Sequence, residues 1–350
     1  MRMTIMLAAI VDTGDLVAAT CSANPAKWRI RREPIKKIAL VLTTLGLCLA
    51  AIHHAKASLL YWADQNTADI SRVNLDGGEQ QVLATGQLGA TGLALDVAAG
   101  QMYWTRQGSG GVIQRANLDG TGQQTLVGQV SAFGIALDTT RDQMYWTDTG
   151  QIRDIRRANF DGTGQQVLVI GQNIQDTPNG IALDITSNKM YWVNQFGGTL
   201  LSANLDGTGQ QLVFGGLTEP TNIAIDLISG QIYIADFQGA IERANLDGTG
   251  LETLVTGQFA AEGIALDIAD DKMYWAAQGG IRRANLDGTG LETVVSGLNF
   301  PIGIALQIEV SEPSSLALLG VGLIAIGALC RRQRASRLAS GIGRQAGAEP

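Results

Sequence analysis

The chain has 350 residues, 45% of them hydrophobic, a formal net charge of −7 and 44 glycines, a composition that favours many short strands joined by tight turns over disorder. Residues 58–310 carry 12 Lys and Arg against 27 Asp and Glu, a formal charge of −15, which excludes nucleic acid as a partner. The same segment contains no His and no Cys, so most imidazole and thiol catalytic sites are excluded as well.

The first predicted element is an N-terminal extension that ends in an export signal, residues 1–57. A basic region from residue 29 leads into an apolar run at 38–51, and the small residues of Ala55-Lys56-Ala57 follow. This order is the layout of a secretory signal peptide, whose cleavage would leave Ser58 first. A retained membrane anchor is the alternative, and residues 1–28 have no predicted role.

Three short phrases then recur six times each between residues 58 and 310. In their commonest forms they read G-I-A-L-D, Y-W and N-L-D-G. A repeat of about 40 to 46 residues that carries four short strands is typical of a β-propeller. We therefore predict that residues 58–310 form an all-β, six-bladed propeller of four-stranded antiparallel blades.

Each phrase has a predicted place in the blade. G-I-A-L-D is the innermost strand, A, whose glycine permits close backbone approach near the central axis. Y-W lies on strand B, and N-L-D-G forms the tight turn between strands C and D. The Asp that ends most A strands is predicted to cap the A–B turn, with a ring of cation ligands as the alternative. These residues are Asp96, Asp138, Asp184, Asp226 and Asp267.

The order of the strands predicts how the ring closes. The repeat region begins with a B strand at 59–62 and ends with an A strand at 303–308. The C-terminal strand therefore joins the first blade, and this pairing leaves no open edge in the ring.

These phrases resemble the low-density lipoprotein receptor class B, or YWTD, repeat over residues 58–308. Tyr145-Trp146-Thr147-Asp148 matches that motif in full, whereas the other copies read YWAD, YWTR, YWVN, YIAD and YWAA. Contacts that the family attributes to the motif Asp are therefore absent from some blades. The resemblance implies a six-bladed propeller that binds protein partners.

Loop lengths predict which face of the propeller binds. The offset from strand A to the Tyr of strand B is 11 residues in all five measurable repeats, whereas the B–C and D–A connections vary in length. Variable loops on a rigid scaffold are typical of a binding surface. The residues before each strand-A glycine are expected to ring the channel mouth on that face. The candidate binding residues are Thr91, Arg106, Phe133, Arg153, Arg156, Asn179, Thr221, Glu262 and Phe300.

Residues 311–350 are the last predicted element. Glu312-Pro313 precedes an apolar stretch at 316–330, and Arg331 and Arg332 follow it, an order that keeps the arginines in the cytoplasm. The segment resembles the PEP-CTERM sorting signal of Gram-negative bacteria, although Ser311 stands where a proline is usual. That resemblance implies processing by an exosortase-type enzyme after transient membrane anchoring. A plain C-terminal membrane anchor is the alternative.

The leading functional hypothesis is a binding or adhesion module, exported to the periplasm, cell surface or extracellular matrix, that recognises protein or polysaccharide and needs no cofactor. The alternative is a metal-dependent propeller enzyme similar to lactonases, in which Asn179 and Glu262 resemble metal-binding positions and calcium or magnesium is the ion. A structural matrix component without a specific ligand is a third reading.

Overall fold

The computed structural model describes residues 58–108, 110–171 and 177–308, together with the backbone of residues 5–10, 16–21 and 30–33. The three short segments form an antiparallel sheet of β1 (Ile5–Ile10), β2 (Leu16–Cys21) and β3 (Ile30–Glu33), where the sequence predicted no fold. The apolar runs at 38–51 and 316–330 lie outside the described residues. Within the described part, no helix is long and apolar enough to cross a membrane.

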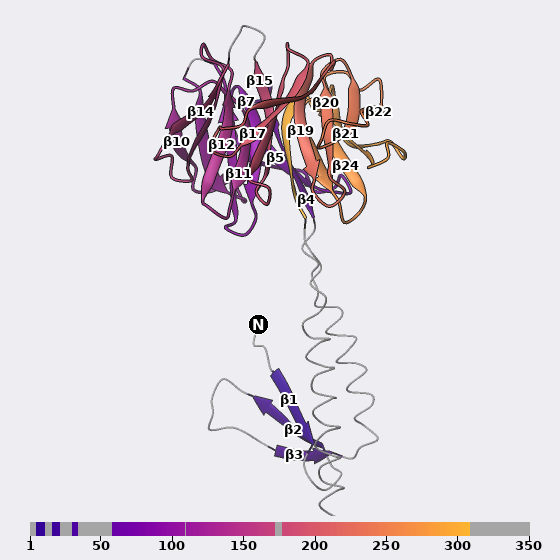
Figure 1. Cartoon of the computed structure of the whole chain (residues 1–350). Coiled ribbons are helices and arrows are strands. Elements are labelled where there is room, and N and C mark those ends of the chain that lie inside the picture. The colour runs from indigo at the N-terminus through magenta and orange to yellow at the C-terminus, as the bar shows by residue number, and fades with distance from the viewer. Residues whose placement is uncertain are drawn as a thin grey trace, which may run out of the picture. The chain divides into compact units, whose positions relative to one another are not determined.

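Residues 57–310 form one compact unit that contains six four-stranded antiparallel sheets, the predicted six blades (Figure 1). Blade 1 is the sheet β27-β4-β5-β6, and blades 2 to 6 are the sheets β7–β10, β11–β14, β15–β18, β19–β22 and β23–β26. The innermost A strands are β7 (Ala90–Asp96), β11 (Ala132–Asp138), β15 (Pro178–Asp184), β19 (Pro220–Asp226), β23 (Ile264–Asp267) and β27 (Pro301–Gln307). The B strands are β4 (Leu59–Asp64), β8 (Gln101–Arg106), β12 (Gln143–Asp148), β16 (Lys189–Asn194), β20 (Gln231–Asp236) and β24 (Lys272–Ala277).

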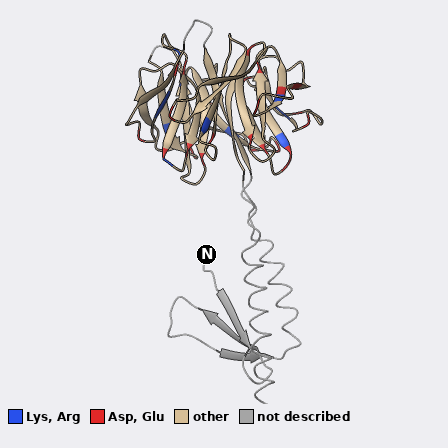
Figure 2. Cartoon of the chain, viewed as in Figure 1, with Lys and Arg blue, Asp and Glu red and all other residues tan. Residues whose placement is uncertain are grey.

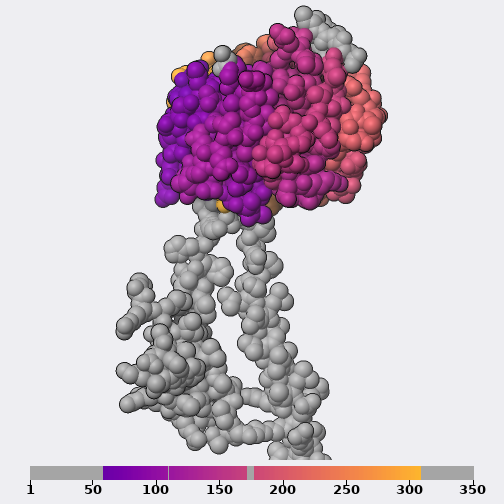
Figure 3. Space-filling model, turned by 90° about the vertical axis from the view of Figure 1, so that its left-hand side faces the viewer, coloured from indigo at the N-terminus to yellow at the C-terminus, as the bar shows by residue number. Residues whose placement is uncertain are grey.

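The two outer strands of each blade complete the sheets. The C strands are β5 (Asp69–Asn74), β9 (Val112–Asn117), β13 (Asp154–Asn159), β17 (Thr199–Asn204), β21 (Ala240–Asn245) and β25 (Gly280–Asn285). The D strands are β6 (Gln81–Ala84), β10 (Gln124–Gly128), β14 (Gln166–Ile170), β18 (Gln211–Gly215), β22 (Glu252–Val255) and β26 (Glu292–Ser296). In the space-filling view, the blades on the side that faces the viewer touch one another (Figure 3).

The ring closes as the sequence predicted. Strand β27 pairs antiparallel with β4, so that Ala305 lies opposite Tyr61 and Gln307 opposite Leu59. The last strand of the repeat region thus becomes the innermost strand of the first blade. Residues at opposite ends of the repeat region share one sheet, and the ring has no unpaired first or last strand.

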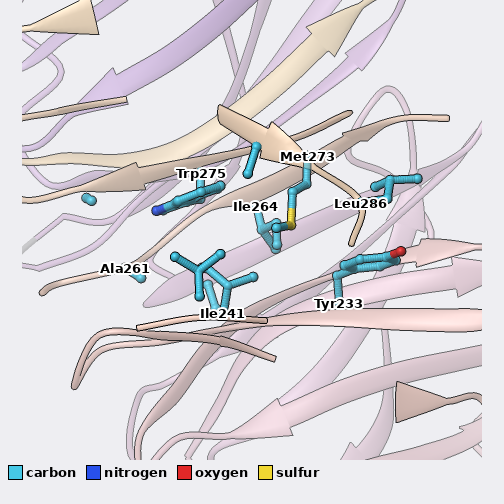
Figure 4. Packing of buried hydrophobic residues seen from close by; sticks show 11 residues of the cluster. Tyr233, Ile241, Ala261, Ile264, Met273, Trp275 and Leu286 are labelled. Carbon is cyan, nitrogen blue, oxygen red and sulfur yellow. The ribbon is translucent and has the colours of Figure 1, made fainter. Parts of the chain in front are cut away.

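Hydrophobic packing joins each blade to the next. Side chains alternate between the two faces of a strand, so the adjacent Tyr and Trp of strand B point toward opposite neighbours. Tyr103 packs with blade 3, whereas Trp104 packs with blade 1. In Figure 4, Tyr233 of blade 5 lies in the same buried cluster as Met273 and Trp275 of blade 6. The core is therefore a set of layers between sheets rather than one central cluster.

Glycines bring the inner strands into backbone contact. A Cβ atom at Gly134 would lie 2.4 Å from the carbonyl oxygen of Asn179, and one at Gly303 would lie 2.1 Å from that of Thr91. The same approach occurs at Gly92, Gly180 and Gly263. The predicted reason for the strand-A glycine is confirmed, because any side chain there would collide with the backbone of the next blade.

Arginines form a second set of contacts near the outside of the ring, which the sequence analysis did not predict. Arg283 on strand C of blade 6 donates from Nη1 to the carbonyl oxygen of Leu75 in blade 1 at 2.9 Å, and its guanidinium lies 5.7 Å from the centroid of the Tyr274 ring. It also forms an ion pair with Glu292 at 2.8 Å. Equivalent arginines are Arg72, Arg115, Arg157 and Arg243. Blade 4 has Ser202 at this position.

Gly134→Ala is expected to lower the free energy of unfolding by about 1–3 kcal/mol, because the new methyl group must displace the backbone of Asn179. Gly128→Ala is the matched control, since a Cβ atom there meets nothing within 4 Å. Chemical denaturation of the two variants measures the difference. Equal stability of both variants would contradict the close approach of the inner strands.

Arg283→Gln is expected to cost about 1–3 kcal/mol of stability, since it removes the contact with Leu75 across the ring closure and the contact with the Tyr274 ring. Arg153→Gln is the control, because the Arg153 side chain has no hydrogen bond or ion pair among the described residues. The measurement is the shift in Tm of each variant. A shift as small as that of the control would show that the guanidinium bridge contributes nothing to closure.

Candidate functional site

The meander of each blade gives the propeller two faces. The A–B and C–D turns lie on one face, called here the A–B face, and the B–C and D–A loops lie on the other, the B–C face. Strand β4 begins, and strand β27 ends, on the A–B face. The described chain therefore enters and leaves through the A–B face (Figure 1).

Aspartates shape the turns of the A–B face. Oδ1 of Asp96 accepts the N–H of Ala99 at 2.9 Å, and Asp138, Asp184, Asp226 and Asp267 accept turn N–H groups in the same way. In the C–D turn, Asp119 accepts both the N–H and the hydroxyl of Thr121, and these bonds hold the pKa of the Asp119 carboxyl below its usual value. The predicted turn-capping role of both groups is confirmed.

The motif threonine connects neighbouring blades at the start of strand A. The Thr105 hydroxyl accepts the N–H of Gly92 at 2.8 Å and donates to the carbonyl oxygen of Phe133 in the next blade at 2.6 Å. Thr147 makes the same pair of bonds to Gly134 and Asn179. The hydroxyl thus fixes the backbone beside the channel, and its role is structural.

The motif aspartate holds the two kinds of loop on the B–C face together. Asp236 accepts the N–H of Gln238 in its B–C loop at 2.9 Å and that of Glu219 in the preceding D–A loop at 2.9 Å. Asp64 and Asp148 bridge their loops in the same manner. Where the copy reads YWTR, Nε of Arg106 instead donates to the carbonyl oxygen of Leu88 in the D–A loop at 3.1 Å.

The residues that precede the strand-A glycines, or Asn222 at the same position in blade 5, are mostly buried. Thr221 donates its hydroxyl to the carbonyl oxygen of Ala261 at 2.8 Å, and Asn179 donates from Nδ2 to Oε1 of Gln195 at 2.9 Å. Thr91, Glu262 and Ile302 are buried as well, and Phe133 is half-buried. The polar groups of Thr221 and Asn179 are thus already used in hydrogen bonds within the protein. That the residues of this set contact a ligand stays a prediction.

Glu262 differs from the other residues in this set. Its side chain is 6% exposed, its Oε2 has no hydrogen-bond partner among the described residues, and burial raises the pKa of the carboxyl to about 8. No group of three or more His, Cys, Asp or Glu in the described ranges is placed to hold a metal ion. The described residues therefore add no such group to Asn179 and Glu262, the two positions of the metal-dependent alternative.

Two cavities on the B–C face contain candidate arginines. One, of about 520 Å³, lies between blades 1 and 2 and is lined by Leu88, Arg106 and Gly108. The other, of about 430 Å³, lies between blades 2 and 3 and is lined by Gly108 and Arg156. Gly108 lines both cavities, so the structure places Arg106 and Arg156 in adjacent cavities of this face. Arg153 lines a cavity of only about 20 Å³ between blades 3 and 4.

Large apolar side chains are exposed on the same face. Phe196 and Phe259 are each 64% exposed, Leu88 is 67% exposed and Ile152 is 55% exposed. Phe300, by contrast, is half-buried, and its N–H donates to Asp64. Sequence reasoning did not single out Leu88 or Ile152, because a lone aliphatic residue in a loop carries no pattern.

Exposed carboxylates gather on one face. Every Asp or Glu that is exposed within the described ranges lies in an A–B turn, in a C–D turn or at the first residue of a D strand, all toward the A–B face, which also carries the exposed Arg141. The B–C face carries half-buried charges of both signs, the cations Arg106, Arg153 and Arg156 and the acids Asp69 and Glu219. Figure 2 marks the acidic and basic residues along the ring. Anionic partners are therefore repelled from one face more than from the other.

Two sequence models of known families match parts of this chain. A sequence model of the low-density lipoprotein receptor repeat class B matches residues 142–185, and one of the PEP-CTERM protein-sorting motif matches residues 309–333. A search of curated proteins gave no match.

Solved structures show the same fold. A chain in the crystal structure of a nidogen/laminin complex is similar with a TM-score of 0.65 and 23% identity, over 72% of this chain and 99% of that one. A candidate TolB protein from Agrobacterium tumefaciens is similar with a TM-score of 0.53 and 12% identity, over the same shares of 72% and 99%. At these identities the likeness shows the propeller fold.

Glu262→Gln is expected to remove a pH dependence of stability. Because the folded-state pKa of Glu262 is raised from 4.5 to about 8, the unfolded chain releases this proton in that interval while the folded chain keeps it. The free energy of unfolding of the wild type therefore falls as pH rises through the interval. The Tm of the variant, relative to wild type, is expected to be higher at pH 8 than at pH 5. Glu79→Gln, at an exposed position, is the control, and an unchanged Tm difference between the two pH values would contradict the assignment.

Proposed function

We propose that this chain, a six-bladed propeller that carries a YWTD-type repeat and a PEP-CTERM sorting motif, is displayed outside the cell as an adhesion module whose B–C face binds an extracellular protein or polysaccharide. Export would begin with the signal peptide at residues 29–57. The tail would anchor transiently through residues 316–330, and an exosortase-type enzyme would recognise the motif that contains Glu312, Pro313, Arg331 and Arg332.

The observation that carries the proposal is the contrast between the two faces. Strand β27, which leads to the sorting segment, ends on the A–B face, and uniform turns and exposed carboxylates occupy that face. The B–C face is not joined to either connection and carries loops of variable length. A rigid ring that presents variable loops on its unattached face is a common arrangement for recognition.

Side chains on the B–C face are of the kinds that anchor interfaces. Exposed Phe196 and Phe259 offer large apolar area, and Arg106 and Arg156 offer guanidinium donors. Aromatic residues and arginine are enriched among the residues that dominate binding energy. The similar chain in the nidogen/laminin structure was solved in a protein complex, which supports a protein partner as one of the two ligand classes.

Phe259→Ser is expected to weaken capture of a surface ligand by about tenfold or more, since an anchoring aromatic side chain is lost. The full-length protein would be screened against extracellular proteins and glycans, and each hit would be measured again with the variant. Ile228→Ser is the matched control, because Ile228 is 88% exposed but lies in an A–B turn. Hits that depend on Ile228 and not on Phe259 would place recognition on the wrong face and overturn the proposal.

A further inference from the structure

The two arginine cavities lie next to each other on the B–C face, and Gly108 lines both; together they are called here the groove. Their volumes, about 520 and 430 Å³, each fall within the range of small-ligand sites. Each cavity lies at a boundary between two blades, so a ligand that occupies both would contact loops from three blades. A chain of linked units is the kind of ligand that reaches from one cavity to the next.

Arg106 is held so that most of its donors remain available. Its Nε donates to the carbonyl oxygen of Leu88 at 3.1 Å, and neither Nη atom has a hydrogen bond within the described residues. No ion pair neutralises its charge within those residues. A guanidinium that is fixed through Nε presents both Nη groups as a fork, and that fork matches the two oxygens of a carboxylate.

Arg156 is held in a different way and offers different chemistry. Its Nε donates to Oδ1 of Asp154 at 2.8 Å, and the Asp154 side chain is fully buried. Because the Asp154 oxygens are buried, only the Nη donors of Arg156 are available to a ligand, and the ion pair leaves them with little net charge. The oxygen atoms of sugar hydroxyl groups accept from such donors.

Hydrogen bonds connect the loops around the two cavities before any ligand binds. Gln107 donates from Nε2 to the hydroxyl of Thr149 at 3.1 Å, and that hydroxyl donates to the carbonyl oxygen of Ser131 at 3.0 Å. These bonds connect the B–C loops of blades 2 and 3 with the D–A loop between them. Pre-ordered donors and acceptors lower the entropy lost on binding.

The lining favours a polysaccharide over a peptide. Amide side chains and bare glycine backbone make up most of the walls, with Leu88 and Ile152 as the exposed aliphatic residues, and no aromatic side chain lines either cavity. Protein interfaces are usually anchored by buried aromatic side chains, whereas amide and peptide groups suit sugar hydroxyls. Asp148 lines the cavity at Arg156, but it is buried and its oxygens accept the N–H groups of Ser131 and Gly150. The lining of the cavity at Arg106 contains no carboxylate, so the charge of Arg106 is free to attract an acidic sugar.

We propose that this groove binds an acidic polysaccharide, with the carboxylate of a uronic-acid unit on Arg106 and the hydroxyl groups of the neighbouring sugar on the Nη donors of Arg156. This inference rests on the proposed function and names its ligand class.

The test uses the full-length protein and two forms of one polymer, polygalacturonate and its fully methyl-esterified derivative. The wild type is expected to bind the acid form about tenfold more tightly, because only that form pairs with Arg106. Arg106→Gln is expected to abolish this preference. The double variant Asp154→Asn/Arg156→Gln leaves no buried unpaired charge and is expected to weaken binding of both forms equally. Lys189→Gln, on the A–B face, is the charge-matched control, and Tm values verify folding.

Three results would overturn the proposal. Equal affinity of the wild type for the acid and ester forms would remove the role of the carboxylate. An Arg106→Gln variant that keeps the preference would move the carboxylate elsewhere. Binding of polyglutamate, but not polygalacturonate, with the same dependence on Arg106 would assign the groove to acidic proteins. If neither form of the polymer binds while another ligand is still captured through Phe259, the proposed ligand class is wrong and the proposed function stands. If the protein binds neither the polymer nor any other ligand through Phe259, the proposed function is wrong as well.

Discussion

The antiparallel pairing of β27 with β4 is the constraint on which the other contacts of the ring depend. Each blade exposes apolar side chains on both of its faces, so it is stable only between two neighbours. Closure gives blades 1 and 6 their second neighbour, with Trp62 of blade 1 and Tyr274 of blade 6 in one buried cluster. The contacts between Gly303 and Thr91 and between Arg283 and Leu75 lie on either side of the same closed blade. Without the pairing, two apolar surfaces would face water.

The ring separates structural and recognition roles within one short repeat. Where a copy has the strand-A Gly, the motif Thr, the Tyr or the Trp, that residue serves contacts between blades, and the turn aspartates of the A–B face accept N–H groups. The B–C face is the part of the propeller that varies between copies. There Arg106 replaces the motif Asp in blade 2, and the loops differ in length. In blade 2 the bond from Nε of Arg106 to the carbonyl oxygen of Leu88 replaces the Asp bridge between the loops.

The sequence was sufficient to predict the architecture because periodicity, glycine position and turn chemistry all repeat six times. The number of blades, the closure and the turn-capping role of residues such as Asp96 are confirmed. The Arg283 contacts were not foreseen, since an Arg on an outer strand has the same pattern as a solvated one and its partner, Leu75, is distant in sequence. The residues before the strand-A glycines were expected around an open channel mouth, yet close backbone approach buries most of them, as Thr221 illustrates. The groove itself depends on how loops of three blades meet, which no single repeat encodes.

The most direct measurement of the central claim is native-state hydrogen exchange at the two strands of the closure. If the ring is closed, the amides of Leu59–Asp64 that pair with Pro301–Gln307 exchange as slowly as those of interior pairs such as β12 with β11, because all of them open only with global unfolding. Fast exchange in either closing strand, with protection retained in blades 2 to 5, would show that the ring is open at this position and would contradict the account.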